Sequence, residues 1–275
     1  MSIADRVIEL NRNELSYPPP VNILEAAREG VTGAHQYLKV TDLQEIKRKL
    51  AAYTRVAEPS ILIGSGVEIL IAQALQLFSR KGKVIILDPT FFMITQIAES
   101  LETRVLKIRL TEPAFSLPFD LLVEEARDSA LVVIDSPNNP TGKLLLERRL
   151  VSDLCQNSAG ILLIDESYYE FCRFSVIDMV KDYPNLVVTR TMSKAFGLAG
   201  LKLGYMVASE SVLRNFASVE LALRPTRPSV YAASAALKDT SYVDKMVTLV
   251  TEERERVSRE ASDIGATVYP SSANF

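Results

Sequence analysis

The sequence contains one histidine, His35, no tryptophan and two cysteines among its 275 residues. A Ser-His-Asp or Cys-His catalytic group would therefore have to use His35, which stands in a polar connection near the N-terminus. A histidine-rich metal site is excluded for the same reason. Cys155 and Cys172 show neither the spacing of metal ligands nor a disulfide framework, so we expect no metal and a reducing compartment, the cytoplasm.

Long apolar runs and a strong charge bias are also lacking. No stretch approaches the ~18 uninterrupted apolar residues of a membrane span, and the first residues show no signal-peptide cleavage pattern. Lys and Arg number 31 against 34 Asp and Glu, which gives no electrostatic reason to expect binding to nucleic acid or to an anionic membrane. We therefore expect a soluble, unprocessed protein with small-molecule partners.

Apolar runs typical of buried strands alternate with helical patterns through the middle of the chain. This alternation predicts an α/β fold with a mostly parallel sheet and helices on both faces. Polar residues at the strand ends would meet at the carboxyl edge of the sheet, where such proteins bind ligands. Asn139, Asp165 and Lys194 follow three of the runs. The runs cover residues 61–63, 84–87, 105–108, 131–135, 161–164 and 186–188.

Lys194 stands in a glycine-rich segment, residues 191–205 (TMSKAFGLAGLKLGY). The segment contains hydroxyl and amine side chains and three glycines, and its apolar residues show no helical period. This composition suggests a backbone that wraps around a small ligand. In a partly dry, cation-rich pocket, a lysine amine has a lowered pKa and can condense with an aldehyde to form a Schiff base. An isolated Ser-Lys pair is more often part of a solvated loop, so the neighbouring motifs decide between the two interpretations.

Three segments together resemble the signatures of the fold type I pyridoxal-phosphate-dependent aminotransferases, most closely the histidinol-phosphate aminotransferases. They are residues 136–142 (SPNNPTG), 165–171 (DESYYEF) and 191–205, in the family's order and spacing. Weaker matches run from Asn11 to Phe275. The resemblance implies the pyridoxal-phosphate transferase fold, with a large α/β domain and a smaller α/β domain that is only partly present. It also implies pyridoxal 5'-phosphate as the cofactor.

The resemblance further implies a role for each site residue. Lys194 would carry the cofactor and move the proton during the reaction. Asp165 would pair with the ring nitrogen, while Asn139 and Tyr168 would hydrogen-bond the ring's phenolic oxygen. Phe91 would stack on the ring, for which any flat aromatic side chain is adequate. The phosphate would be held by Ser65, Gly66, Val67, Thr191, Ser193 and Lys202, together with Tyr37 from a neighbouring subunit.

The expected phosphate-binding turn, residues 64–67 (GSGV), precedes an apolar helical stretch. Glycines before a helix leave N–H groups and the positive end of the helix dipole facing a ligand, which suits phosphate, although such a turn is more often only a tight turn. The family's acidic pair after this turn is reduced to Glu68. Lys202 stands where the family has arginine, and it keeps the charge but loses the bidentate fork, which predicts a looser phosphate geometry.

Residues 11–20 (NRNELSYPPP) are predicted to form an irregular arm after a short helix, because three consecutive prolines exclude helix and interior strand. In the resembled family such an arm crosses the active-site mouth, which makes Tyr17 a candidate substrate contact; a polyproline connector is the alternative. Tyr37 is the retained residue of the family's Tyr-Pro-Asp sequence, whose tyrosine reaches the neighbouring subunit's cofactor phosphate. The resemblance thus implies a homodimer with shared active sites.

We expect three parts of the chain. Residues 1–34 would be an arm with a contribution to the small domain, residues 35–238 the large cofactor-binding domain, and residues 239–275 the truncated start of the small domain. A long charged helix over residues 241–264 would lead into the family's first small-domain strand, and the family's arginine for the substrate carboxylate would follow Phe275. A further helix is predicted from Thr41, as its capping residue, to Tyr53.

These features favour amino transfer from histidinol phosphate to 2-oxoglutarate. Residues 223–229 (LRPTRPS) differ from the family's Pro-Tyr-Asn-Val-Asn on the substrate side, so alternatives stay open. One is an aminotransferase of another amino acid, aromatic or aspartate, and a second is a lyase similar to the threonine-phosphate decarboxylases. A non-enzymatic binding module is disfavoured because Lys194, Asp165 and Asn139 are all present.

Overall fold

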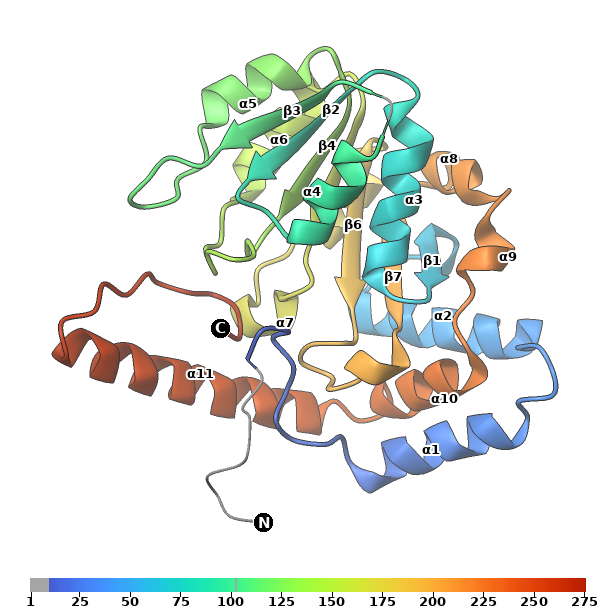
Figure 1. Ribbon diagram of the computed structural model, residues 1–275. Coiled ribbons are helices and arrows are strands. Elements are labelled where there is room, and N and C mark those ends of the chain that lie inside the picture. Colours follow the sequence, from blue (N-terminus) through green and yellow to red (C-terminus); the bar gives the residue numbers. More distant parts are fainter. Residues whose placement is uncertain (1–9, 102) are drawn as a thin grey trace.

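The computed structural model describes residues 10–101 and 103–275, so the short helix expected before the arm lies outside the described residues. Within these ranges, seven strands form a single sheet in the order β1-β7-β6-β5-β4-β2-β3 (Figure 1). β7 runs antiparallel to its neighbours β1 and β6, and the other pairs are parallel. The strands are β1 (Ile61–Gly64), β2 (Lys83–Asp88), β3 (Val105–Arg109), β4 (Ser129–Asp135), β5 (Ile161–Asp165), β6 (Leu186–Thr191) and β7 (Gly204–Ala208).

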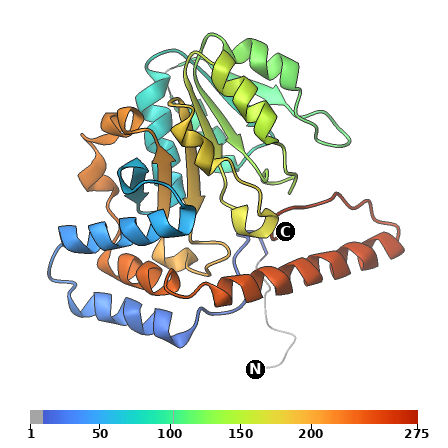
Figure 2. The ribbon, with the colours of Figure 1, turned by 180° about the vertical axis from the view of Figure 1, so that it is seen from behind.

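Helices cover both faces of the sheet, as Figures 1 and 2 show from opposite sides. On one face pack α3 (Val67–Ser79), α4 (Phe92–Glu99), α8 (Glu210–Leu213), η5 (Arg214–Phe216) and α9 (Glu220–Leu223). The other face is covered by α2 (Val40–Thr54), α5 (Phe119–Ala126), α6 (Arg148–Asn157), α7 (Tyr169–Cys172) and η3 (Ile177–Lys181). The same buried cluster includes residues of α10 (Arg227–Ala236), of the start of α11 (Ser241–Asp263) and of α1 (Val21–Thr32), which packs against α10. The short turns η2 (Glu58–Ser60) and η4 (Ala199–Leu201) precede β1 and β7.

The central strands are apolar on both sides because each side contributes to a different core. In β4, Val132 and Ile134 belong to one buried cluster, while Leu131 and Val133 belong to the other. Side chains alternate between the faces of a strand, so a strand covered on both faces reads as a continuous apolar run. The predicted mostly parallel sheet with helices on both faces is confirmed.

Two local predictions fail. Thr41 does not cap α2, which begins at Val40 after Lys39 and has no side-chain cap. The segment after α11 forms no strand; residues 264–275 are irregular and return to the loop after β4, where the Ser272 main-chain N–H donates to the Gly142 carbonyl at 2.7 Å. Local sequence patterns carry no information about such a return contact.

Three strand ends lie side by side at the carboxyl edge of the sheet. Asp135 at the end of β4 pairs in register with Asp165 at the end of β5, and Asp165 pairs with Thr189 in β6. Because parallel neighbours end at the same edge, the residues that follow these strands face one space. No helix in the described ranges is both long enough and apolar enough to cross a membrane.

Candidate active site

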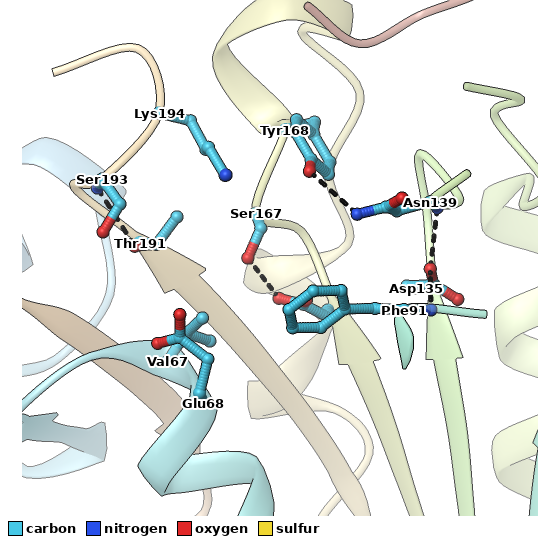
Figure 3. A pocket seen from close by; sticks show the side chains of 11 residues that line it. Val67, Glu68, Phe91, Asp135, Asn139, Ser167, Tyr168, Thr191, Ser193 and Lys194 are labelled. Carbon is cyan, nitrogen blue, oxygen red and sulfur yellow. Dashed lines mark hydrogen bonds between the residues drawn. The ribbon is translucent and has the colours of Figure 1, made fainter. Parts of the chain in front are cut away.

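A pocket opens at this edge, and residues from several strand ends line it together with the start of α3 (Figure 3). Eight of the predicted site residues lie in its wall: Val67, Phe91, Asn139, Asp165, Tyr168, Thr191, Ser193 and Lys194. Glu68, Asp135 and Ser167 complete the lining, and neither Asp135 nor Ser167 was among the predicted site residues.

Asp165 is a buried carboxylate at the end of β5. Its Oδ1 accepts hydrogen bonds from the hydroxyls of Ser167 at 2.8 Å and Thr189 at 3.0 Å, and it forms no ion pair within the described ranges. Burial, together with the nearby carboxylate of Asp135, raises the pKa of Asp165 to about 7. A buried acid in this state would be stabilised by a cationic group of a ligand placed against it.

Lys194 extends into the pocket toward Tyr168 (Figure 3). Its Nζ donates to the Arg12 carbonyl at 2.8 Å and lies 5.7 Å from the centroid of the Tyr168 ring. Burial lowers the pKa of Lys194, although the carboxylates of Glu68, Glu14 and Asp165 oppose the shift. A lowered pKa increases the fraction of neutral, nucleophilic amine at a given pH.

Tyr168 receives two amide donors on its hydroxyl oxygen. Asn139 Nδ2 donates at 3.3 Å and Asn13 Nδ2 donates at 3.1 Å. Burial raises the pKa of Tyr168 to about 12, so its O–H stays protonated near neutral pH and remains available as a donor. Asn139 and Tyr168 are thus adjacent, as the resemblance implied, and Asn13 from the arm joins them.

Asp135 organises the wall that carries the aromatic ring and the amide. Its carboxylate accepts from the Thr90 hydroxyl at 2.7 Å, Asn138 Nδ2 at 3.0 Å and two main-chain N–H groups, Asn139 at 2.8 Å and Phe91 at 3.3 Å. These bonds fix the two turns in which Phe91 and Asn139 stand. The signal for Asp135 was present, since it ends β4 as Asp165 ends β5.

A buried ion pair stands behind the pocket. Arg190 Nε donates to Glu166 Oε2 at 2.9 Å, and both side chains are at most 3% exposed. The Val176 main-chain N–H donates to Glu166 Oε1 at 2.7 Å, and the Arg190 guanidinium lies 3.5 Å from the centroid of the Tyr169 ring. The sequence did not predict this pair, because Arg190 on β6 and Glu166 just after β5 lie 24 positions apart in the chain and neither lines the pocket.

The N-terminal arm contacts two residues of the pocket, Lys194 and Tyr168, and the last residues of the chain lie beside the arm. The Asn13 carbonyl accepts from Asn274 Nδ2 at 3.0 Å, and the Phe275 ring meets the Tyr168 ring edge to face at 5.2 Å. Tyr17 stands outside the pocket lining with its side chain 56% exposed. Its part in substrate binding stays a prediction.

The start of α3 forms a cradle of main-chain N–H groups. Gly66 has φ +98°, a left-handed conformation that glycine adopts without strain, and a Cβ on Gly204 would collide with the main-chain nitrogen of Val67. β7 therefore approaches the helix start closely. The N–H groups at the start of a helix lack helical partners and attract anions.

The other predicted phosphate contacts are distributed around this cradle. Ser193 and Thr191 line the pocket, and the Ser193 main-chain N–H donates to Thr191 Oγ1 at 3.1 Å. Ser65 is directed elsewhere, because its hydroxyl donates to the Arg224 carbonyl at 3.0 Å. Lys202 Nζ lies 3.3 Å from Glu68 Oε1, and the side chain of Lys202 is largely exposed.

Tyr37 does not reach the pocket of its own chain. Its side chain is 100% exposed, and it lines a separate groove together with Leu38, Leu221 and Pro225. Its predicted contact with a neighbouring subunit stays a prediction.

Comparison with known proteins identifies the family to which the chain belongs. Residues 5–275 match the family model described as aminotransferase class I and II. The chain is 33% identical over 273 residues to a histidinol-phosphate aminotransferase of Sulfurisphaera tokodaii, covering 98% of this chain and 76% of that one. It is 32% identical over 270 residues to a histidinol-phosphate aminotransferase of Thermococcus gammatolerans, covering 98% and 77%.

A solved structure shows the same fold around a bound ligand. It is the histidinol-phosphate aminotransferase of Sinorhizobium meliloti in complex with pyridoxal-5'-phosphate, with a TM-score of 0.86, 26% identity, and coverage of 95% of this chain and 72% of that one. The sheet with its pocket, the three sequence signatures and the match over nearly the whole chain agree. The chain therefore belongs to the class I and II aminotransferases.

Proposed function

We propose that this protein is a pyridoxal-phosphate-dependent aminotransferase that moves the amino group of histidinol phosphate to 2-oxoglutarate. The main support is that three residues from the ends of different strands line one pocket: Asp165 ends β5, Asn139 follows β4 and Lys194 follows β6. The curated relatives named above support the choice of substrate.

The pocket fits the two charged ends of pyridoxal phosphate. The buried carboxylate of Asp165, which forms no ion pair within the described ranges, suits a protonated ring nitrogen. The main-chain N–H groups of the first turn of α3, from Val67 onward, suit a phosphate. Asn139 and Tyr168 would hold the phenolic oxygen. The remaining contacts would be Phe91 against the ring, and Thr191, Ser193 and Lys202 around the phosphate. Ser65 would join them only by giving up its hydrogen bond to the Arg224 carbonyl.

When bound, pyridoxal phosphate supplies an aldehyde that bonds to amines and a ring that accepts electrons from the substrate's α-carbon. Lys194 would hold the aldehyde, and its free Nζ would then take the proton from the α-carbon and return it during amino transfer. Its lowered pKa suits that task. Asp165 stays ionised beside a cationic ring nitrogen, because an opposite charge lowers the pKa of a carboxyl group.

We further infer a cytoplasmic homodimer that takes an amino donor and a 2-oxo acid as its small-molecule partners. The fully exposed Tyr37 and the 74% exposed Leu221 line one groove, which supports a subunit contact there. The division into residues 1–34, 35–238 and 239–275 is part of the same proposal. It is supported by the single sheet that residues 61–208 build.

Glutamate alone tests the reaction class. Adding it to the cofactor-loaded protein should convert the absorption of the cofactor's aldehyde form to that of its amine form, and histidinol phosphate should do the same. Release of carbon dioxide from a phosphorylated amino acid, without that conversion, would indicate a decarboxylase instead. Conversion by aspartate or an aromatic amino acid but not by histidinol phosphate would contradict the proposed substrate.

Asp165→Asn should keep the cofactor but lower the rate of amino transfer by roughly 100-fold or more, because a neutral amide cannot hold a cationic ring nitrogen. Single-turnover absorption with glutamate measures this rate. A rate near that of the wild type would show that the ring nitrogen has another partner.

The same substitution should change the stability of the cofactor-free protein. Burial raises the pKa of Asp165 from 3.8 to about 7, so the folded chain binds a proton that the unfolded chain has released. The wild type should therefore lose stability as the pH rises through this interval, and Asp165→Asn should lose less. Unfolding midpoints at about pH 5 and about pH 8 give the comparison, and equal losses in the two proteins would contradict it.

Shared active sites can be tested by mixing two variant subunits, one with a weakened phosphate contact and one without the reactive lysine. If Tyr37 acts in the neighbouring subunit, a heterodimer of Tyr37→Phe with Lys194→Ala has one site with both lesions and one site with neither. Activity should reappear on mixing. A bond from the phenol to a phosphate is worth only ~1.5–3 kcal/mol, so the activity of Tyr37→Phe alone is the baseline. No recovery above it, in a mixture shown to contain heterodimers, would rule out the shared site.

A further inference from the structure

Glu68 places a carboxylate inside the part of the pocket that suits an anion. It stands second in α3, directly after Val67, and it lines the pocket with Thr191 and Ser193. Figure 3 shows its carboxylate pointing from the helix start into the pocket, on the side of those two residues. The same space is the one that the N–H groups of α3 make attractive to a phosphate.

Lys202 is held by this carboxylate. Its Nζ lies 3.3 Å from Glu68 Oε1, and the side chains of Lys202 and Glu68 are 61% and 25% exposed. Both side chains lie over Gly66, since a Cβ added there would meet Glu68 Oε2 at 2.7 Å and Lys202 Cδ at 3.5 Å. The ion pair therefore sits directly above the N-terminus of α3.

The Glu68 carboxylate affects the charged groups of the pocket. Glu68 is the largest single electrostatic influence that raises the pKa of Lys194 against burial, and it also raises the pKa of Asp165. A phosphate bound at the start of α3 would lie beside a carboxylate of the same sign and would need the same lysine. Two negative charges side by side repel each other, and this repulsion is screened less in a partly buried site than in bulk water.

We propose that Glu68 competes with phosphate for Lys202 and for the N-terminus of α3, and so sets how tightly this pocket holds a phosphorylated ligand. Without an anion the carboxylate neutralises Lys202. When a phosphate binds, Lys202 exchanges the carboxylate for the phosphate, and the carboxylate moves toward solvent. This inference deepens the proposed function, on which it rests for the identity of the phosphorylated ligand.

Glu68→Gln tests the competition, because glutamine keeps the length of the side chain and removes its charge. We expect inorganic phosphate to bind about tenfold more tightly to the full-length variant than to the wild type, measured by calorimetry. The affinity of the variant for pyridoxal phosphate, relative to its affinity for unphosphorylated pyridoxal, should rise by a similar factor. This ratio cancels any effect of Glu68 on Lys194, since both aldehydes react with the same amine.

Glu45→Gln is the matched control. Glu45 also pairs with a lysine, Lys49 at 2.8 Å, but it stands on α2 and does not line the pocket. Removing its charge should leave phosphate binding unchanged. An equal gain in Glu45→Gln would mean that net charge alone is responsible and would overturn the proposal.

Lys202→Ala separates competition for the lysine from plain repulsion. In that background Glu68→Gln should tighten phosphate binding by clearly less than about tenfold, because no lysine remains to be shared. An undiminished gain would contradict the exchange. Unchanged or weaker phosphate binding by Glu68→Gln alone would also contradict it, since Glu68 would then only position Lys202 or stabilise α3.

The outcomes for this inference and for the proposed function are distinct. If pyridoxal phosphate fails to form a complex with the wild type, the proposed function fails, while the phosphate titrations still decide the role of Glu68. If the wild type forms that complex but Glu68→Gln and Glu45→Gln bind phosphate with the same affinity, the proposed function stands and the inference fails.

Discussion

The ion pair between Arg190 and Glu166 fixes the two strand ends on which the site depends. Glu166 comes directly after Asp165, the last residue of β5. Arg190 comes directly before Thr191, the last residue of β6. Each member of the ion pair is therefore the sequence neighbour of a residue that lines the pocket. Side chains of adjacent strand residues point to opposite faces. The ion pair, on the side away from the pocket, thus sets the spacing of Asp165 and Thr191 on the pocket side.

Breaking such a pair leaves one buried charge without compensation, which costs ~3–5 kcal/mol. The additional bonds to Glu166 from Ser175 and from the Val176 main chain make its position still more restricted. The end of β5 and the turn after it, which carry Asp165, Ser167 and Tyr168, are therefore held by several bonds at Glu166. Catalytic groups need this kind of support, since small displacements are costly to catalysis.

Charge is unevenly distributed along the pocket. One end holds the buried carboxylates of Asp165 and Asp135, and the other holds the start of α3, with Lys202 outside the lining and paired to Glu68. A ligand with a cationic ring at one end and an anionic phosphate at the other matches this polarity. Glu68 is the exception within the positive end, which is why its charge is expected to tune binding there.

The sequence predicted those parts of the structure that local patterns encode. Apolar runs located the strands, and the polar residues after them, Asn139 and Asp165, were correctly expected at one edge. Contacts between distant segments were not encoded in this way. Lys194 meets the carbonyl of Arg12, 182 positions earlier in the chain, and the end of the chain folds back on Gly142 instead of forming a strand.

Chemical labelling of the cofactor-loaded protein identifies the reactive amine on which the proposed function depends. Borohydride reduction of the cofactor-loaded protein, followed by peptide mapping, should place the cofactor on Lys194 alone. Lys194→Ala should lose the label, whereas Lys49→Ala, which removes a lysine outside the pocket, should keep it. A label on Lys202 or on any other lysine in the wild type would contradict the account.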